Sequence, residues 1–129
     1  VNGIKISRKT DYPNNGKITV RCNSNKKQIA FRIPCWCKSF NINKKYSIKN
    51  GYAYVDLDSE ENIELELDMP VRIISANRRI HSDAGRIAVM RGPVVYCAED
   101  YEKIPLTLIP YYAFANRGES EMQVWLLRK

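Results

Sequence analysis

The sequence predicts an all-β fold, an antiparallel and jelly-roll-like β-sandwich of about ten short strands. Three observations predict it: the apolar segments are short, they alternate with polar residues, and Gly, Pro, Asn or Asp bound nearly all of them. The expected strand segments, in chain order, are 4–7, 17–21, 28–33, 39–42, 46–49, 52–57, 62–67, 71–75, 86–90, 94–98 and 122–127. No helix is expected.

The dipeptide Asn50-Gly51 gives the clearest local prediction. A two-residue type I′ turn needs positive φ at both central positions, and Asn-Gly is the pair that supplies it best. The flanking strands should therefore form a hairpin in which Ile48 lies opposite Ala53. On this register the second strand places Ala53, Val55 and Leu57 on its core face and Tyr52, Tyr54 and Asp56 on its outer face.

Later strands differ in how many faces they bury. Segment 62–67 alternates cleanly, so Ile63, Leu65 and Leu67 should point inward while Glu64 and Glu66 point to solvent. Segments 94–96 and 124–127, by contrast, are apolar on both faces. Such strands should be covered on both sides, by a second sheet and by a loop or a neighbouring domain.

The size and composition fit a soluble globular protein. The chain has 129 residues, of which 44% are hydrophobic and 27% charged, and this predicts one domain over residues 1–129. Residues 106–129 are expected to form a terminal segment that packs back on the sandwich. No membrane span and no secretory signal is recognisable. Because the first residue is Val1 rather than Met, we expect a piece of a longer protein.

The chain is basic, with 21 Lys and Arg against 14 Asp and Glu and a net charge of +7. This excess raises the question of a polyanionic partner. The basic residues are scattered, however, and form no recognisable nucleic-acid motif, so solvated surface charge is the favoured interpretation and no nucleic-acid partner is expected.

The cysteine pattern predicts no metal site. Cys22, Cys35, Cys37 and Cys97 form no Cys-x-x-Cys pair, and His81 is the one histidine. Free buried thiols are expected, with Cys22 and Cys97 as candidate core residues. A disulfide remains the alternative. No cofactor is expected.

Two pairs of carboxylates have a spacing that overlaps the separation used by glycosidases. Glu64 with Glu66, and Asp56 with Asp58, would lie about 6.6 Å apart on a strand that rises ~3.3 Å per residue. A catalytic acid needs a partly buried apolar cleft, whereas Glu64 and Glu66 fall on a polar strand face. Solvated surface is therefore expected, and no catalytic residue is assigned.

The aromatic residues offer a different kind of site. Tyr52 and Tyr54 share the outer face of one strand and could form a small platform on which a sugar ring stacks. The competing interpretation is that they pack under a loop or against another domain. Trp36, which follows a proline turn, is expected to plug the core.

Several strings of this sequence closely resemble the β-rich C-terminal part of glycoside hydrolase family 127, the bacterial β-L-arabinofuranosidases. They include Tyr12-Pro13, Gly16-Lys17-Ile18-Thr19-Val20, Arg32-Ile33-Pro34-x-Trp36-Cys37-Lys38, Arg91-Gly92-Pro93, Pro110-Tyr111-Tyr112 and Glu121-Met122-x-Val124-Trp125-Leu126. The strings around Arg91-Gly92-Pro93 and Pro110-Tyr111-Tyr112 are specific.

The resemblance implies a context rather than a catalyst. In that family an (α/α)6 barrel carries the active site, with a glutamate and cysteines that hold zinc, one cysteine as nucleophile, and β-sandwich domains after the barrel. No barrel motif has a counterpart here, so no catalytic or metal role is transferred to the four cysteines. The resemblance thus implies a non-catalytic accessory sandwich of a larger hydrolase, which supports the helical catalytic domain.

Two alternatives stay open. The chain could be a stand-alone carbohydrate-binding module that uses Tyr52 and Tyr54, with plant-derived carbohydrate as its ligand. It could also bind a polyanion through its positive charge. No membrane partner is expected, and exposed strand edges could support a homodimer.

Overall fold

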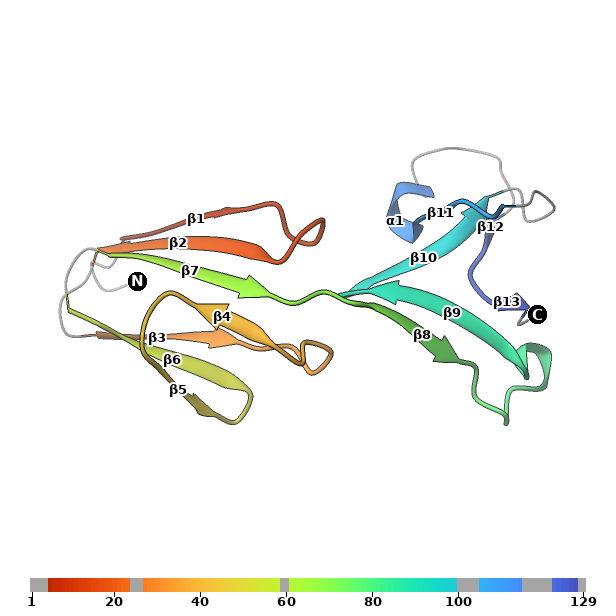
Figure 1. Cartoon of the computed structure of the whole chain (residues 1–129), viewed down its shortest axis with the longest axis horizontal. Helices are drawn as coiled ribbons and strands as arrows, with labels where there is room; N and C mark the ends of the chain where they lie inside the picture. The colour runs from red at the N-terminus through yellow and green to blue at the C-terminus, as the bar shows by residue number, and fades with distance from the viewer. Residues whose placement is uncertain (1–4, 24–26, 59–60, 100–104, 115–121, 128–129) are drawn as a thin grey trace. The chain divides into compact units, whose positions relative to one another are not determined.

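The structure is a computed structural model that describes residues 5–23, 27–58, 61–99, 105–114 and 122–127 (Figure 1). It divides into two compact units, Val1–Met69 and Pro70–Lys129. All strand pairs are antiparallel, which confirms the predicted all-β class. The prediction of one domain over residues 1–129 is untested by this division and stays a prediction.

Unit 1 is a sandwich of two antiparallel sheets. Its strands are β1 (Lys5–Thr10), β2 (Lys17–Asn23), β3 (Lys27–Arg32), β4 (Phe40–Ile42), β5 (Tyr46–Lys49), β6 (Tyr52–Leu57) and β7 (Glu61–Leu67). A four-stranded sheet has the order β1-β2-β7-β4, and a three-stranded sheet has the order β3-β6-β5. The two sheets face each other in Figure 1.

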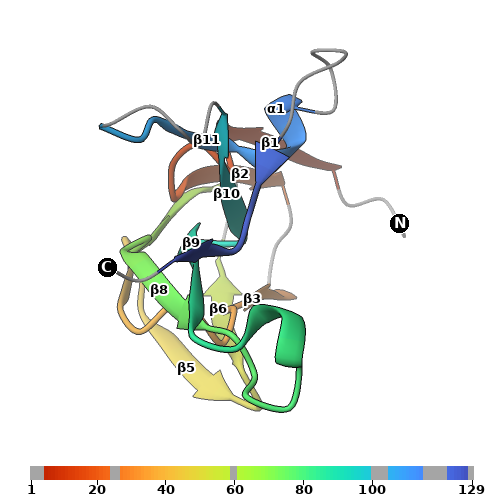
Figure 2. The same ribbon diagram turned by 90° about the vertical axis from the view of Figure 1, so that its right-hand side faces the viewer.

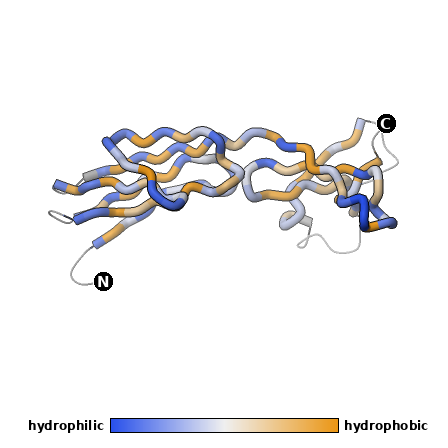
Figure 3. The backbone as a smooth tube through the Cα atoms, turned by 90° about the horizontal axis from the view of Figure 1, so that it is seen from below, coloured by the Kyte–Doolittle hydropathy of each residue, from blue (hydrophilic) through white to orange (hydrophobic). Residues whose placement is uncertain are grey.

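The core of unit 1 lies between these sheets, where each strand contributes the apolar half of its alternation. Ile63 and Leu65 on β7 are buried in one cluster with Val55 and Leu57 on β6. The same alternation is visible as orange and blue along the strands in Figure 3. Trp36 packs partly buried against this cluster, as expected. Period-two patterning therefore decides which side chains enter the core.

The predicted hairpin is confirmed in its turn and register. Asn50 and Gly51 have φ of 51° and 76°, and Ile48 pairs with Ala53. Ala53 is fully buried, but Ile48 is 63% exposed although it shares that face. The difference arises because β5 is the edge strand of its sheet.

Unit 2 contains one six-stranded sheet. Its elements are β8 (Val71–Ser75), η1 (His81–Asp83), β9 (Arg86–Arg91), β10 (Val94–Glu99), β11 (Leu108–Pro110), α1 (Tyr111–Phe114), β12 (Met122–Gln123) and β13 (Leu126–Leu127). Strands β11, β10, β9 and β13 neighbour one another in that order, while β8 pairs with β9 and β12 with β10. Figures 1 and 2 both show β8 beside β9 along the edge of this sheet.

Both faces of this sheet carry apolar side chains. Ile73 pairs with Val89 and Val89 with Tyr96, which places these three on one face. Met90 pairs with Val95 on the other face. The predicted two-sided apolar character of the segment 94–96 is therefore present in the sheet.

Four parts of the structure differ from the sequence prediction. The expected strand 122–127 is two short strands, because Trp125 lies at a bend where its carbonyl accepts a hydrogen bond from Gln123 Nε2 at 3.1 Å. Strand β11 and the single turns η1 and α1 were not expected. The last two span three and four residues, too few for a 3.6-residue period to show. Among the residues described, neither helix has the length or apolar composition to span a membrane.

Candidate functional site

The tyrosine pair predicted as a sugar platform lies on the outer face of the three-stranded sheet. Tyr52 is 39% exposed and Tyr54 is half-buried. Their ring centroids are 6.4 Å apart and the ring planes are tilted by 47°. A flat sugar face can stack on one of these rings, but the tilt prevents one continuous flat surface.

Polar side chains surround the two tyrosines in strand register. Tyr52 lies between Arg32 on β3 and Lys49 on β5. On the same face, beyond Tyr54, Gln28 lies opposite Asp56, and its Nε2 donates a hydrogen bond to Asp56 Oδ1 at 2.8 Å. The outer face of this sheet thus joins an exposed ring to cationic groups at one end and to a fixed amide–carboxylate pair at the other.

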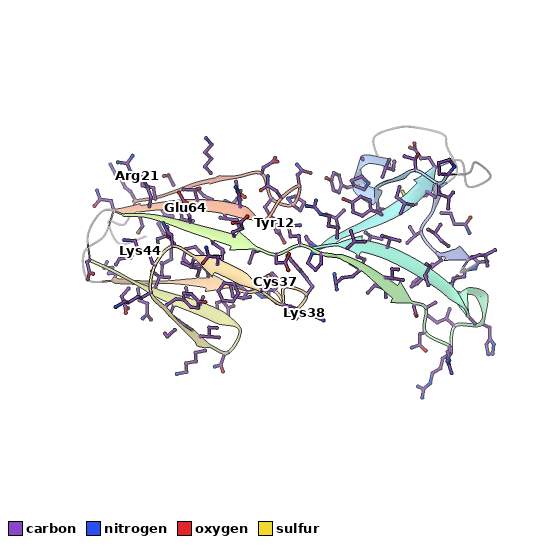
Figure 4. All side chains as sticks on the ribbon, in the orientation of Figure 1. Tyr12, Arg21, Cys37, Lys38, Lys44 and Glu64 are labelled. Carbon is purple, nitrogen blue, oxygen red and sulfur yellow. The ribbon has the colours of Figure 1, made fainter. Side chains whose placement is uncertain are left out.

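The carboxylates weighed for catalysis lie on exposed strand faces. Glu64 and Glu66 are exposed on the outer face of the four-stranded sheet, and Asp56 and Asp58 are exposed at the outer side of β6 and its end. Figure 4 labels Glu64 on its strand.

A small hollow lies over the strands that carry Glu64 and Glu66, and the sequence analysis did not identify it. Its volume is about 140 Å³. Six polar side chains line it: Lys17, Thr19, Asn41, Asn43, Glu64 and Glu66. The signal in the sequence is the alternation on β2 and β7, but their pairing with each other is not readable from local pattern.

The cysteines are free, and three of them, Cys22, Cys37 and Cys97, are buried, whereas Cys35 is exposed. The expectation of core positions for Cys22 and Cys97 is confirmed. The expectation that the thiols are buried is wrong for Cys35, which follows Pro34 in a turn and leaves the strand alternation.

Cys37 is held in its protonated form by its surroundings. Its Sγ donates a hydrogen bond to the carbonyl of Ser39 at 3.0 Å. Burial raises the pKa of this thiol, and the negative charge of Asp68 raises it further, against the opposing effect of backbone hydrogen bonds. Figure 4 shows Tyr12 at the same end of unit 1, and burial followed by the charge of Cys37 raises the pKa of its hydroxyl.

Cys97 has the same character in unit 2. Its Sγ lies 3.7 Å from the carbonyl oxygen of Ile109. Burial, followed by the negative charge of Glu99, raises the pKa of the thiol. Since the thiolate is the nucleophile and the metal ligand, a raised pKa makes Cys37 and Cys97 poor at either role.

The described ranges bring no three His, Cys, Asp or Glu side chains together in a way that could hold a metal ion. His81 lies exposed in η1, in the connection between β8 and β9.

Protein-family comparison assigns the chain in two parts. A model described as "Beta-L-arabinofuranosidase, GH127 middle domain" matches residues 1–71, and one described as "Glycoside hydrolase family 127 C-terminal domain" matches residues 71–127. The first match alone covers more than half of the chain. The chain belongs to glycoside hydrolase family 127. The border between the two matches falls beside the border between the two compact units of this GH127 chain, at Met69 and Pro70.

Similar proteins agree with this family. The GH127 chain is 33% identical over 114 residues to the non-reducing end beta-L-arabinofuranosidase of Bifidobacterium longum, in a match that covers 78% of this chain. Among solved structures it is similar to a protein described as a glycoside hydrolase, with a TM-score of 0.78 and 26% identity over 96% of this chain. It is also similar to the GH127 beta-L-arabinofuranosidase from Geobacillus stearothermophilus T6, with a TM-score of 0.77 and 26% identity over 98% of this chain.

These relatives are much longer than the GH127 chain. It spans 17% of the Bifidobacterium enzyme and 32% and 31% of the two solved chains.

Proposed function

We propose that this GH127 chain is the non-catalytic accessory β-sandwich part of a bacterial hydrolase that resembles the β-L-arabinofuranosidases. Its task is to support a helical catalytic domain by covering part of that domain's surface. By itself the chain breaks no glycosidic bond. The family matches to a middle and a C-terminal domain, together with the short span of the relatives that the chain covers, support this assignment.

The observation that carries the proposal is the apolar strand at the edge of the unit 2 sheet. Val71 and Ile73 on β8 are 65% and 66% exposed. They share a face with Val89, and the opposite face of the same sheet is apolar as well. An apolar strand face of this kind is typical of a surface that another protein part covers. The greater length of the relatives supports the catalytic domain as the part that covers it.

The chemistry of the described side chains supports a non-catalytic role. The carboxylates of Asp56, Glu64 and Glu66 lie on exposed strand faces, whereas a catalytic acid needs a partly buried apolar cleft. Cys37 and Cys97 are buried, with pKa values raised by that burial. An assay of the isolated chain on aryl β-L-arabinofuranosides should give no turnover above buffer, with or without added zinc. Zinc-dependent turnover would contradict the proposal.

A second test concerns the longer protein. The DNA upstream of Val1 should encode a helical barrel, and the absence of such a barrel would contradict the proposal.

A third test concerns docking. In the protein that joins both parts, Ile73→Asp should place a charge in the covered surface and reduce the yield of folded enzyme at least fivefold. Ile48→Asp, at a β-strand residue of nearly equal exposure in unit 1, is the matched control and should leave the yield unchanged. Equal effects of the two variants would exclude β8 as the docking surface.

Carbohydrate binding by Tyr52 and Tyr54 is the second candidate function. The exposed ring of Tyr52 and its polar neighbours Arg32 and Lys49 favour it. Titration with plant cell-wall oligosaccharides, followed by intrinsic fluorescence, tests it. A module of this kind should bind saturably and lose binding in the double variant Tyr52→Ala, Tyr54→Ala. Absence of saturable binding to the unaltered chain would exclude this function.

A further inference from the structure

We propose that the hollow on the outer face of the four-stranded sheet is a binding site for a neutral, polyhydroxylated ring of monosaccharide size. This site lies in the sheet β1-β2-β7-β4 and is separate from the tyrosine pair, which lies on the sheet β3-β6-β5. It does not depend on the docking of unit 2 or on the activity of any longer protein.

Antiparallel register assembles the hollow from three strands. Lys17 on β2 lies opposite Glu66 on β7, and Glu66 lies opposite Asn41 on β4. Thr19 lies opposite Glu64 in the neighbouring row. Directly opposed residues have Cβ atoms about 5 Å apart on the same face. Two rows of hydrogen-bonding side chains therefore stand next to each other over a volume of about 140 Å³.

Asn43 fixes one end of the hollow. The ladder between β4 and β7 ends at Ile42 and Leu65, and Asn43 extends it through both its backbone and its side chain. Its N–H donates to the Glu64 carbonyl at 3.1 Å, and its Oδ1 accepts from the Glu64 N–H at 2.9 Å. Its Nδ2 donates to the Asn62 carbonyl at 3.3 Å. The backbone beneath Glu64 is thus held by three hydrogen bonds, which pre-organises this wall of the site.

The groups that line the hollow match the hydroxyl groups of a sugar. A hydroxyl is both a donor and an acceptor, so neighbouring hydroxyls need acceptors and donors side by side. The carboxylates of Glu64 and Glu66 supply acceptors, Lys17 supplies donors, and the amide of Asn41 and the hydroxyl of Thr19 supply both.

The charges favour a neutral ligand. Two carboxylates line the hollow and disfavour an anion, while Lys17 lies among them. Lys9 lies next to the hollow, opposite Thr19 on β1, and Arg21 follows on β2. These cationic groups offset the charge of the carboxylates and disfavour a cation.

Size and lining set the expected ligand and affinity. Pockets for drug-sized ligands measure about 300–1,000 Å³, so a hollow of about 140 Å³ accommodates one ring at most. Its lining contains no aromatic residue on which the ring could stack. The binding energy comes from hydrogen bonds made in competition with water, so each bond contributes little. The expected Kd is therefore in the millimolar range.

Titration of the full 129-residue chain by two-dimensional ¹H–¹⁵N NMR tests this site, with L-arabinose as the neutral probe. The expected result is a saturable change in the amide signals of Thr19, Asn41 and Glu64. Glucuronate and glucosamine, the anionic and cationic probes, should leave these signals unsaturated at the same concentrations. Saturation by either charged probe with equal affinity would overturn the assignment of a neutral ligand.

Matched variants test whether L-arabinose binds in the hollow. Glu64→Ala and Asn41→Ala should each weaken L-arabinose binding at least fivefold. Asp56→Ala removes an exposed carboxylate from the outer face of the other sheet and should leave binding unchanged. Melting temperatures close to that of the unaltered chain show that each variant is folded. Signals that move only around Tyr52, no saturable change at all, or an equal loss in Asp56→Ala would each overturn the proposal.

Discussion

Burial changes the acidity of two thiols in this chain. Cys97 is fully buried and Cys37 nearly so, and burial raises the pKa of both. Exposed Cys35 lies two residues from Cys37 in the sequence. The position of each thiol relative to the sheets, rather than its neighbours in the sequence, decides its exposure.

The raised pKa values predict a loss of stability in alkaline solution. Above about pH 8.5 the unfolded chain releases the protons of its thiols, while folded Cys37 and Cys97 keep theirs. The unfolded state then binds fewer protons than the folded state, so the free energy of unfolding falls as the pH rises. Urea denaturation at pH 7.5 and pH 9.5 measures this fall.

The double variant Cys37→Ala, Cys97→Ala is the control for that measurement. Removing two buried groups lowers its stability at both pH values, but its fall between pH 7.5 and pH 9.5 should be smaller than that of the unaltered chain. Cys35→Ala, at the exposed thiol, should leave the fall unchanged. An equal fall in all three proteins would show that the buried thiols do not cause it.

At the scale of elements, two glycines are required for different physical reasons. Gly51 has φ of 76° in the β5–β6 turn, and a Cβ there would meet no atom within 4 Å. A Cβ on Gly16 would overlap the carbonyl oxygen of Leu67, at the end of the antiparallel ladder between β2 and β7. The Leu67 N–H donates to the Gly16 carbonyl at 3.0 Å at this close approach. One glycine serves a turn and the other serves a close approach of two backbones.

Substitution by alanine separates these two roles. Gly51→Ala should cost about 1 kcal/mol of unfolding free energy, because an L-residue is strained at positive φ. Gly16→Ala should cost about 3 kcal/mol, since the obstacle is backbone that cannot rotate away. Urea denaturation of both variants measures the difference. Equal losses would show that the close approach of Gly16 and Leu67 can open to admit a methyl group.

Local sequence patterns predict most strands of this chain because each strand carries its own alternation and its own turn residues. The Asn50-Gly51 turn fixes the register of β5 on β6. Pro34 predicts the end of the strand segment 28–33, and β3 stops close to it, at Arg32. The same patterns place Tyr52 on the outer face. They do not reveal the exposure of Ile48, which depends on the place of β5 at the edge of its sheet.

Local sequence patterns do not predict the hollow on the four-stranded sheet, for a related reason. Its rows join β2 to β7 and β7 to β4, strands that are far apart in sequence. The alternation indicates that Lys17 and Glu66 face solvent. It does not indicate that the two residues lie opposite each other on neighbouring strands. The pairing of distant strands depends on the tertiary fold, so a site built across it appears only in the structure.

At the scale of the whole molecule, the two compact units bury different kinds of core. The buried cluster of unit 1 lies between two sheets and includes Ile63 and Val55. Unit 2 is one sheet, its buried residues are mostly small, and β8 leaves Ile73 exposed. A unit as small as Pro70–Lys129 buries too little of its surface to be more than marginally stable by itself. We therefore expect unit 2 to unfold together with unit 1, as one domain over residues 1–129 would.

The two tryptophans make this expectation measurable, because Trp36 lies in unit 1 and Trp125 in unit 2. Trp125→Phe leaves a fluorescence signal from unit 1, and Trp36→Phe leaves one from unit 2. In each background, Ile63→Ala should cost about 3 kcal/mol through a cavity in the core of unit 1. If the chain is one cooperative domain, Ile63→Ala shifts the urea midpoint seen by Trp125 as much as the midpoint seen by Trp36. A shift confined to the Trp36 signal would instead mean two domains that meet at Met69 and Pro70, each with a stability of its own.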